Sequence, residues 1–203
     1  MNPEDALSLL DWKRQIFALY ERVRNTRDSR KAWTDWCTTR DQLFKNHPQS
    51  PIPVVSRDSY QGIPVFDYRE DLRVTGKLRR AESAEIEIPD SDGGAVHFTR
   101  FAQVHLEVGS VEMSLDIFWL LGYGGGIFLP FRDATAGTST YGAGRYLYDT
   151  VKGADLGGSG NTLVLDFNFA YNPSCSYDTR WVCPLAPTGN RLDTAIEAGE
   201  RIQ

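Results

Sequence analysis

The first 25 residues place apolar side chains at intervals of three and four positions, the spacing of one helical face. Ile16, Tyr20 and Val23 carry this pattern. Just before it, Asn2 is a residue type that caps helix N-termini, and Pro3 suits the first helical position. The sequence therefore predicts an amphipathic helix that begins next to Asn2.

A second stretch with the same period predicts a helix that begins near Asp28 or Ser29 and ends before His47 and Pro48. Four prolines then interrupt residues 47–70, which show little periodicity, so we expect an extended strap there. The face that the second helix should bury combines apolar residues with one cation: Trp33, Trp36, Cys37, Arg40, Leu43 and Phe44.

From Leu72 onward the apolar period changes to two, and glycine-containing turn signals recur every 8 to 14 residues or so. No helical crossover separates these segments, so we expect a largely antiparallel sheet. The connectors are DSDGG, Gly109-Ser110, GYGGG and, at residues 155–160, DLGGSG. The expected strands cover residues 71–80, 84–88, 96–108, 112–123, 127–132, 145–148 and 162–169.

These elements predict an α+β fold, a mostly antiparallel β-sandwich or flattened barrel with two N-terminal helices. A chain of 203 residues with 41% hydrophobic residues can bury one core, so we expect a single domain over residues 1–203. Its parts would be the N-terminal helices (1–46), the strap (47–70) and a β-domain with an irregular C-terminal tail (71–203).

The net charge of −5 argues against nucleic acid as a partner, because non-specific binding needs many phosphate-neutralising cations. No window resembles a membrane span, and the N-terminus lacks the pattern of a signal peptide. We therefore expect a cytoplasmic protein without a membrane partner. One basic run could hold a phosphorylated ligand, although a solvated helix end is the favoured explanation: Arg22, Arg24, Arg27, Arg30 and Lys31.

The C-terminal half is dense in polar residues, glycine and cysteine, in the segments FRDATAGTSTYGAGRYL, LDFNFAYNPSC, CPLAPTGNRL and IEAGE. These segments resemble the hallmark stretches of an uncharacterised bacterial and archaeal family, the domain of unknown function 1684. A weaker likeness extends through the helical start and the HPQSP strap. The resemblance implies one domain of about this length, and it implies no activity, substrate or cofactor for any position here.

Two polar residues alternate with apolar ones in the expected strand 162–169. Asp166 and Asn168 would share the face opposite Leu165. An enclosed Asp166 needs a cation or several donors. It is either one half of a structural ion pair with Arg145, Arg180 or Arg191, or part of a ligand-binding floor with Asn168 and Arg145.

The segment TSTYGAGRY places glycines between side chains that can donate or accept hydrogen bonds. Asp133 could act as a general base and Tyr141 as a proton donor, with Thr140 and Arg145 orienting a polar substrate. Each of them could equally stabilise a turn, and for Thr135 we favour that structural role.

Cys175 and Cys183 lie eight positions apart in an irregular segment. The close CxxC pair of zinc sites is absent, and few histidines could complete a site, so we predict no metal ligands. The alternatives are two buried packing thiols or a pair that forms a disulfide when oxidised. In the closing IEAGE, Glu197 is expected to face water, while Glu200 is expected to have a fixed partner such as Arg191 or Arg145.

The leading functional hypothesis is a pocket in the C-terminal β-domain that binds a small polar or anionic metabolite, with Thr140, Arg145, Asn168 and Asn172 as ligand-binding residues. The alternative is a hydrolase- or isomerase-type enzyme that uses Asp133 or Asp166 as the base, Tyr141 as the acid and Arg145 as the electrostatic stabiliser. A structural or interaction protein is the third possibility. The pattern specifies neither a cofactor nor an oligomeric state.

Overall fold

Two long helices open the chain in the computed structural model, which describes residues 2–202. α1 covers Pro3–Asn25 and α2 covers Ser29–Asn46. The Asn2 side chain accepts a hydrogen bond from the backbone N–H of Asp5 at 2.7 Å. Asp28 caps α2 through the backbone N–H of Lys31 at 3.0 Å. Both predicted helices and their boundaries are confirmed, because the capping residues and the apolar period indicate the same positions.

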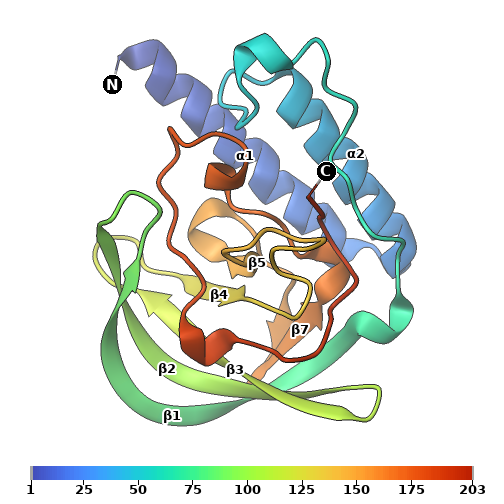
Figure 1. Cartoon of the computed structure of the whole chain (residues 1–203), viewed down its shortest axis with the longest axis vertical. Helices are drawn as coiled ribbons and strands as arrows, with labels where there is room; N and C mark the ends of the chain where they lie inside the picture. The colour runs from blue at the N-terminus through green and yellow to red at the C-terminus, as the bar shows by residue number, and fades with distance from the viewer. Residues whose placement is uncertain (1, 203) are drawn as a thin grey trace.

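Within the described residues, the segment from Arg73 to Asp166 forms one antiparallel sheet of seven strands in the order β5-β4-β3-β2-β1-β7-β6. Figure 1 shows that the long β1–β2 hairpin curls, so the sheet closes partway toward a barrel. The predicted α+β class with two N-terminal helices is confirmed, in the form of a single curled sheet. The strands are β1 (Arg73–Pro89), β2 (Ala95–Val108), β3 (Val111–Leu120), β4 (Ile127–Phe131), β5 (Arg145–Asp149), β6 (Gly158–Ser159) and β7 (Thr162–Asp166).

Several strand boundaries differ from the prediction. The expected strand 112–123 ends at Leu120 as β3, because the glycine-rich turn begins directly after it. The first two expected strands are one strand, β1, with a register shift between Arg80 and Ala84 that bends it. The two-residue strand β6 lies in a segment that we predicted as a connector. β7 ends at Asp166 rather than at Phe169, because residues 167–169 form a short 3₁₀ turn.

The strap and the C-terminal tail run alongside each other (Figure 1). Residues 47–70 contain one short 3₁₀ turn, Val54–Ser56, and a second begins at their end, at Glu70, as the prolines lead one to expect. The tail pairs with the strap where the backbone N–H of Phe66 donates to the carbonyl of Gly199 at 2.9 Å. Val65 and Glu200 form a β-bridge at the same place. The tail therefore connects the strap to the sheet.

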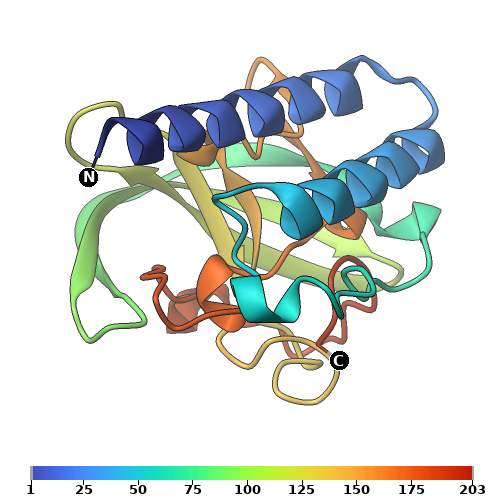
Figure 2. The same cartoon turned by 90° about the horizontal axis from the view of Figure 1, so that it is seen from above.

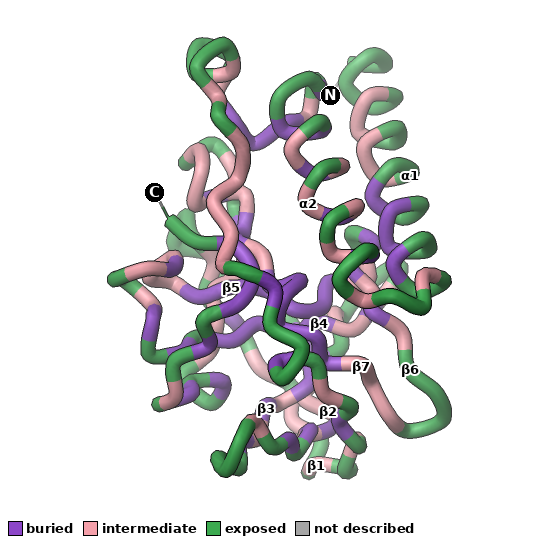
Figure 3. The backbone as a smooth tube through the Cα atoms, turned by 90° about the vertical axis from the view of Figure 1, so that its right-hand side faces the viewer, coloured by how far each residue is buried: buried purple, intermediate pink, exposed green. Residues whose placement is uncertain are grey.

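α1 and α2 lie next to each other on one side of the sheet (Figure 2). Their buried faces join a hydrophobic cluster that continues through the sheet and into the tail, with members from Ile16 to Ala198. The buried residues of α1 all lie in its second half, near the turn into α2 (Figure 3). Among residues 2–202, no helix has both the length and the apolar character that crossing a membrane requires.

Candidate functional site

Arg145 is fully enclosed, and its guanidinium holds the C-terminal tail. It donates hydrogen bonds to the carbonyls of Ile196 at 2.9 Å and Glu200 at 3.2 Å, and also to the carbonyl of Ala198. A fourth contact joins its Nη2 to Asp133 Oδ1 at 3.3 Å. Burial lowers the pKa of Arg145, and the neighbouring Asp133 opposes that effect. The structure thus brings two predicted site residues together, at a position where the tail occupies most of the arginine's donors.

Asp133 and Thr140 complete this cluster. Asp133 Oδ2 accepts from the backbone N–H of Ile196 and from the hydroxyl of Thr135, each at 2.7 Å. The hydroxyls of Thr135 and Thr140 share a hydrogen bond of 2.8 Å. All of these side chains are buried. The loop from Asp133 to Thr140 is therefore linked to the tail through polar groups that are already hydrogen-bonded.

Glu200 has a partner that we did not predict from the sequence. Its Oε1 accepts hydrogen bonds from Arg40, with the Nε atom at 2.9 Å. Its Oε2 accepts from the backbone N–H of Asn172 at 2.7 Å and from the hydroxyl of Tyr177 at 2.8 Å. The expected fixed partner exists, but it is Arg40 of α2; Arg191 is exposed, and Arg145 reaches only the backbone carbonyl of Glu200.

A sequence signal for this pair was present. Arg40 lies on the face of α2 that we predicted to be buried, and a buried arginine requires an anion. We call the two arginine clusters together the tail clamp, namely Arg145 with Asp133, Thr140 and the tail carbonyls, and Arg40 with Glu200.

Tyr141 lies in a different environment. Its hydroxyl is 3.8 Å from the sulfur of Cys175. A hydrogen bond with Cys183 is the main cause that lowers the pKa of Cys175 to about 6, whereas burial raises the pKa of Tyr141 to about 12. Cys175 and Cys183 are both buried free thiols. Within residues 2–202, no three His, Cys, Asp or Glu side chains are grouped so that they could hold a metal ion.

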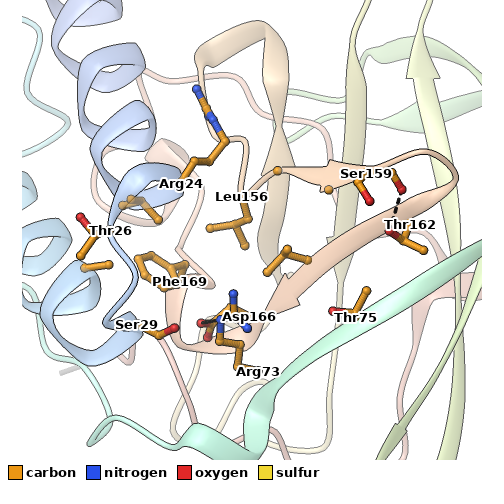
Figure 4. Close-up of a pocket in the computed structure, with 15 residues that line it drawn as sticks. Arg24, Thr26, Ser29, Arg73, Thr75, Leu156, Ser159, Thr162, Asp166 and Phe169 are labelled. Atoms are coloured by element: carbon orange, nitrogen blue, oxygen red, sulfur yellow. Dashed lines mark hydrogen bonds and ion pairs between the residues drawn. The ribbon is translucent and has the colours of Figure 1, made fainter.

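Asp166 faces a cavity of about 430 Å³ at the turn between α1 and α2 (Figure 4). Register places Asp166 directly opposite Arg73 on β1, so the two side chains share a face of the sheet. Thr75 of β1 and Thr162 of β7 also line the cavity, and Arg24 and Ser29 line it from the helices. The structure brings neither Tyr141 nor Arg145 to this cavity.

Only one of the two Asp166 carboxylate oxygens has a hydrogen bond. Oδ1 accepts from the backbone N–H of Asn168 at 3.1 Å and from its side-chain amide at 2.8 Å. Oδ2 is buried and accepts no hydrogen bond from any group in residues 2–202. Arg73 Nε lies 3.5 Å from this oxygen, in a geometry that forms an ion pair but no hydrogen bond. The structural partner that we expected among Arg145, Arg180 and Arg191 is therefore Arg73, on the neighbouring strand.

Asn168 fixes this arrangement. Its amide oxygen accepts from the backbone N–H of Arg69 at 2.8 Å, and its amide nitrogen donates to the carbonyl of Arg69 at 2.7 Å. The same nitrogen donates to Asp166, so the end of the strap, Asn168 and Asp166 are linked. Burial raises the pKa of the Asp166 carboxyl to about 6, while the Asn168 hydrogen bonds and Arg73 oppose that effect.

Asn172 lies apart from the Asp166 cavity. Its backbone N–H reaches Glu200, and its side-chain amide nitrogen donates to the carbonyl of Arg201 at 3.1 Å. It lines a second cavity, between the strap and the tail. The four residues predicted to bind a ligand are thus distributed over three places: Thr140 and Arg145 in the tail clamp, Asn168 behind Asp166, and Asn172 at the second cavity.

Comparison with known proteins gives the chain a family but no activity. No curated protein matches it. The chain is similar to the solution NMR structure of an uncharacterized protein from gene locus rrnAC0354 of Haloarcula marismortui, with 32% identity and a TM-score of 0.62. That similarity covers 89% of this chain and 97% of the other. The family described as "Protein of unknown function (DUF1684)" matches residues 58–201, from within the strap to the end of the tail. The chain belongs to the DUF1684 family of proteins of unknown function.

Proposed function

We propose that this protein binds a small polar molecule with an anionic group in the Asp166 cavity. One observation carries the proposal: the buried Oδ2 atom of Asp166 has no hydrogen-bond partner within residues 2–202, and Asp166 lines a cavity of about 430 Å³. Leaving a buried carboxylate oxygen without a donor costs free energy, and such groups are retained where a ligand supplies the donor.

The cavity lining indicates the chemistry of the ligand. Asp166 requires a donor, such as a hydroxyl, and Arg73 supplies a partly exposed cation beside it. Arg24 already contacts Asp155, at 2.7 Å from its carbonyl and 3.4 Å from its carboxylate, so Arg73 is the cation with more capacity for an anion. The hydroxyls of Thr75 and Ser159 make no hydrogen bonds within residues 2–202. A phosphorylated polyol or sugar offers the matching groups.

Arg73 gives access to the buried oxygen. Its side chain is 41% exposed, whereas that of Asp166 is 2% exposed. An exposed arginine can rotate from its position over Asp166 toward the anionic group of a ligand, and the ligand hydroxyl then reaches Oδ2. In this proposal Asn168 positions Asp166, while Asp133, Thr140 and Arg145 hold the tail and take no part in binding.

The raised pKa of Asp166 favours a second candidate function, that of an enzyme. Its pKa of about 6 means that the carboxyl changes protonation state close to neutral pH, as a general acid or base must. An isomerase- or hydrolase-type reaction would then use Asp166 to move a proton and Arg73 to stabilise the negative charge. Tyr141 and Arg145 do not line this cavity, so this form of the enzyme hypothesis replaces them with Arg73.

Titration calorimetry tests the binding proposal directly. We expect sugar phosphates to bind more tightly than inorganic phosphate or neutral polyols, since only they match both Asp166 and Arg73. Asp166→Asn should weaken binding by about tenfold or more, the loss expected for one charge-assisted hydrogen bond. The control is Asp92→Asn, which removes an exposed carboxylate in the β1–β2 turn and should leave binding unchanged.

Equal affinity in the two variants, or no saturable binding of any probe, would overturn the proposal. The same probes, followed by NMR for chemical conversion, test the enzyme candidate. Conversion by the wild type that Asp166→Asn abolishes supports that candidate. Binding of a probe without chemical conversion supports the binding proposal and contradicts the enzyme candidate.

A further inference from the structure

The second cavity lies between the strap and the tail and has a volume of about 500 Å³. Ile52, Tyr60 and Ile63 line it from the strap, and Asn172 and Ser176 line it from the C-terminal segment. It shares no lining residue with the Asp166 cavity. Any ligand that it holds would therefore contact a different set of side chains.

Two buried polar atoms at this cavity have no hydrogen-bond partner within residues 2–202. They are Oδ1 of Asn172 and Oγ of Ser176. Asn172 is only 4% exposed, and the carbonyl of Arg201 fixes its amide nitrogen, so the unpaired atom is the carbonyl oxygen. One unpaired buried atom is an ordinary exception, but two that line one cavity indicate groups that a ligand satisfies.

Two tyrosines line the same cavity with their hydroxyls already engaged. Tyr60 donates to Asp41 at 2.9 Å, and Tyr177 donates to Glu200 at 2.8 Å. They therefore offer ring surface rather than hydrogen bonds. Together with Ile52 and Ile63 they form an apolar part of the wall, which suits an apolar group on the ligand.

Arg201 supplies a cation at the cavity. Its guanidinium lies 4.9 Å from the centre of the Phe66 ring, and it forms no ion pair within the part of the chain that the structure describes. Its backbone N–H donates to the carbonyl of Pro64 at 2.8 Å, which holds the residue against the strap. The cavity thus combines an acceptor, a hydroxyl, apolar side chains and a cation.

We infer that this second cavity binds a small α-amino or α-hydroxy acid with an apolar side chain. The ammonium or hydroxyl group donates to Asn172 Oδ1 and contacts Ser176 Oγ. The carboxylate pairs with Arg201, and the apolar side chain packs against Ile52 and Ile63. This site is separate from the Asp166 cavity and does not depend on the function proposed there.

Ser176→Ala is the decisive variant, because the hydroxyl makes no hydrogen bond to any group in residues 2–202 and its loss should not disturb the fold. Calorimetry with L-leucine and 2-hydroxyisocaproate should show saturable binding that Ser176→Ala weakens by about fivefold to tenfold. Ser174→Ala removes a hydroxyl from the same 3₁₀ turn but not from the cavity lining, and it should bind as the wild type does.

Two more comparisons test the assigned contacts. L-leucinamide, which lacks the carboxylate, and hexanoate, which lacks the amine and hydroxyl, should each bind at least about tenfold more weakly than L-leucine. Arg201→Gln should remove the preference for L-leucine over L-leucinamide. Asp166→Asn should leave L-leucine binding unchanged, so failure here is distinguishable from failure at the Asp166 cavity. The inference is overturned if neither acid binds at millimolar concentration, or if Ser176→Ala and Ser174→Ala bind them equally.

Discussion

The tail clamp and the Asp166 cavity are both built from buried charges, but they satisfy those charges differently. In the tail clamp, the Glu200 carboxylate receives hydrogen bonds at both oxygens from Arg40, Asn172 and Tyr177. At the cavity, groups within residues 2–202 donate to one oxygen of Asp166 and not to the other. Arg145 Nε in the tail clamp is also buried without a partner within residues 2–202, but Arg145 lines neither cavity. A carboxylate paired at both oxygens indicates a structural role, whereas an unpaired oxygen beside a cavity indicates a group available to a ligand.

The largest effect is expected in the tail clamp. Arg40→Met keeps most of the side-chain length against Trp36 and Phe44 but leaves the Glu200 carboxylate buried without its cation. Breaking a buried ion pair on one side costs about 3–5 kcal/mol. Urea unfolding at pH 7 should show a loss of this size in the free energy of unfolding.

The control for this prediction is Arg22→Met, which breaks the exposed Arg22–Asp35 pair between the same two helices. An exposed pair contributes at most about 1 kcal/mol. The double variant Arg40→Met/Glu200→Leu should be less destabilised than Arg40→Met alone, because it removes the uncompensated charge. Equal losses in the free energy of unfolding for Arg40→Met and Arg22→Met would show that the buried Arg40–Glu200 pair contributes no more than an exposed pair, and the structural role of the tail clamp would be contradicted.

The sequence predicts the elements of this fold well where local chemistry decides them. Asn2 and Asp28 cap the two helices, and Gly109, with φ of +62°, turns β2 into β3 as the glycine signal predicts. The prediction is wrong at β7, since Phe167 and Phe169 continue the apolar alternation while the backbone turns into a 3₁₀ helix. A 3₁₀ turn that buries both rings has the same alternation of apolar and polar residues as a strand, so the sequence pattern does not distinguish the two.

The candidate site was only partly predictable, because its contacts join distant parts of the chain. The polar character of Asp166 and Asn168 is visible in the sequence, but the partners Arg73 and Arg69 follow from strand register and from the path of the strap. The Arg40–Glu200 pair spans 160 positions. Spacing along the chain carries no information about such a pair, although an arginine on an apolar helix face shows that one must exist.

At neutral pH, the loss of the Asp166 charge in Asp166→Asn should raise the free energy of unfolding, whereas Arg40→Met should lower it. The pKa of Asp166 rises from 3.8 to about 6 on folding, so the folded state holds this proton more tightly than the unfolded chain does. Stability from this group is fully present below about pH 4 and is lost as the pH rises through about 6. A difference of about 2 between the two pKa values corresponds to about 3 kcal/mol at neutral pH.

Urea unfolding of the wild type and of Asp166→Asn between pH 4 and pH 8 measures this effect. The variant should become more stable than the wild type as the pH rises, by up to about 3 kcal/mol relative to their difference at pH 4. Asp92→Asn should show no such trend, since its carboxylate is exposed. A wild type that gains stability over Asp166→Asn with rising pH would show that the carboxylate is well paired, and the cavity would then resemble the tail clamp.

The smallest effects on stability are expected from a Thr→Val substitution, made once in the tail clamp and once at the Asp166 cavity. Thr140→Val removes a buried hydroxyl that shares a 2.8 Å hydrogen bond with Thr135, so it should cost about 1–2 kcal/mol. Thr75→Val removes an exposed hydroxyl at the Asp166 cavity that has no partner within residues 2–202, and it should change stability by less than about 0.5 kcal/mol. Because each change replaces a threonine hydroxyl by a methyl group, chemical denaturation compares the paired and the unpaired hydroxyl directly. If both variants lose the same stability, Thr75 has a structural partner, and its hydroxyl is not available to a ligand.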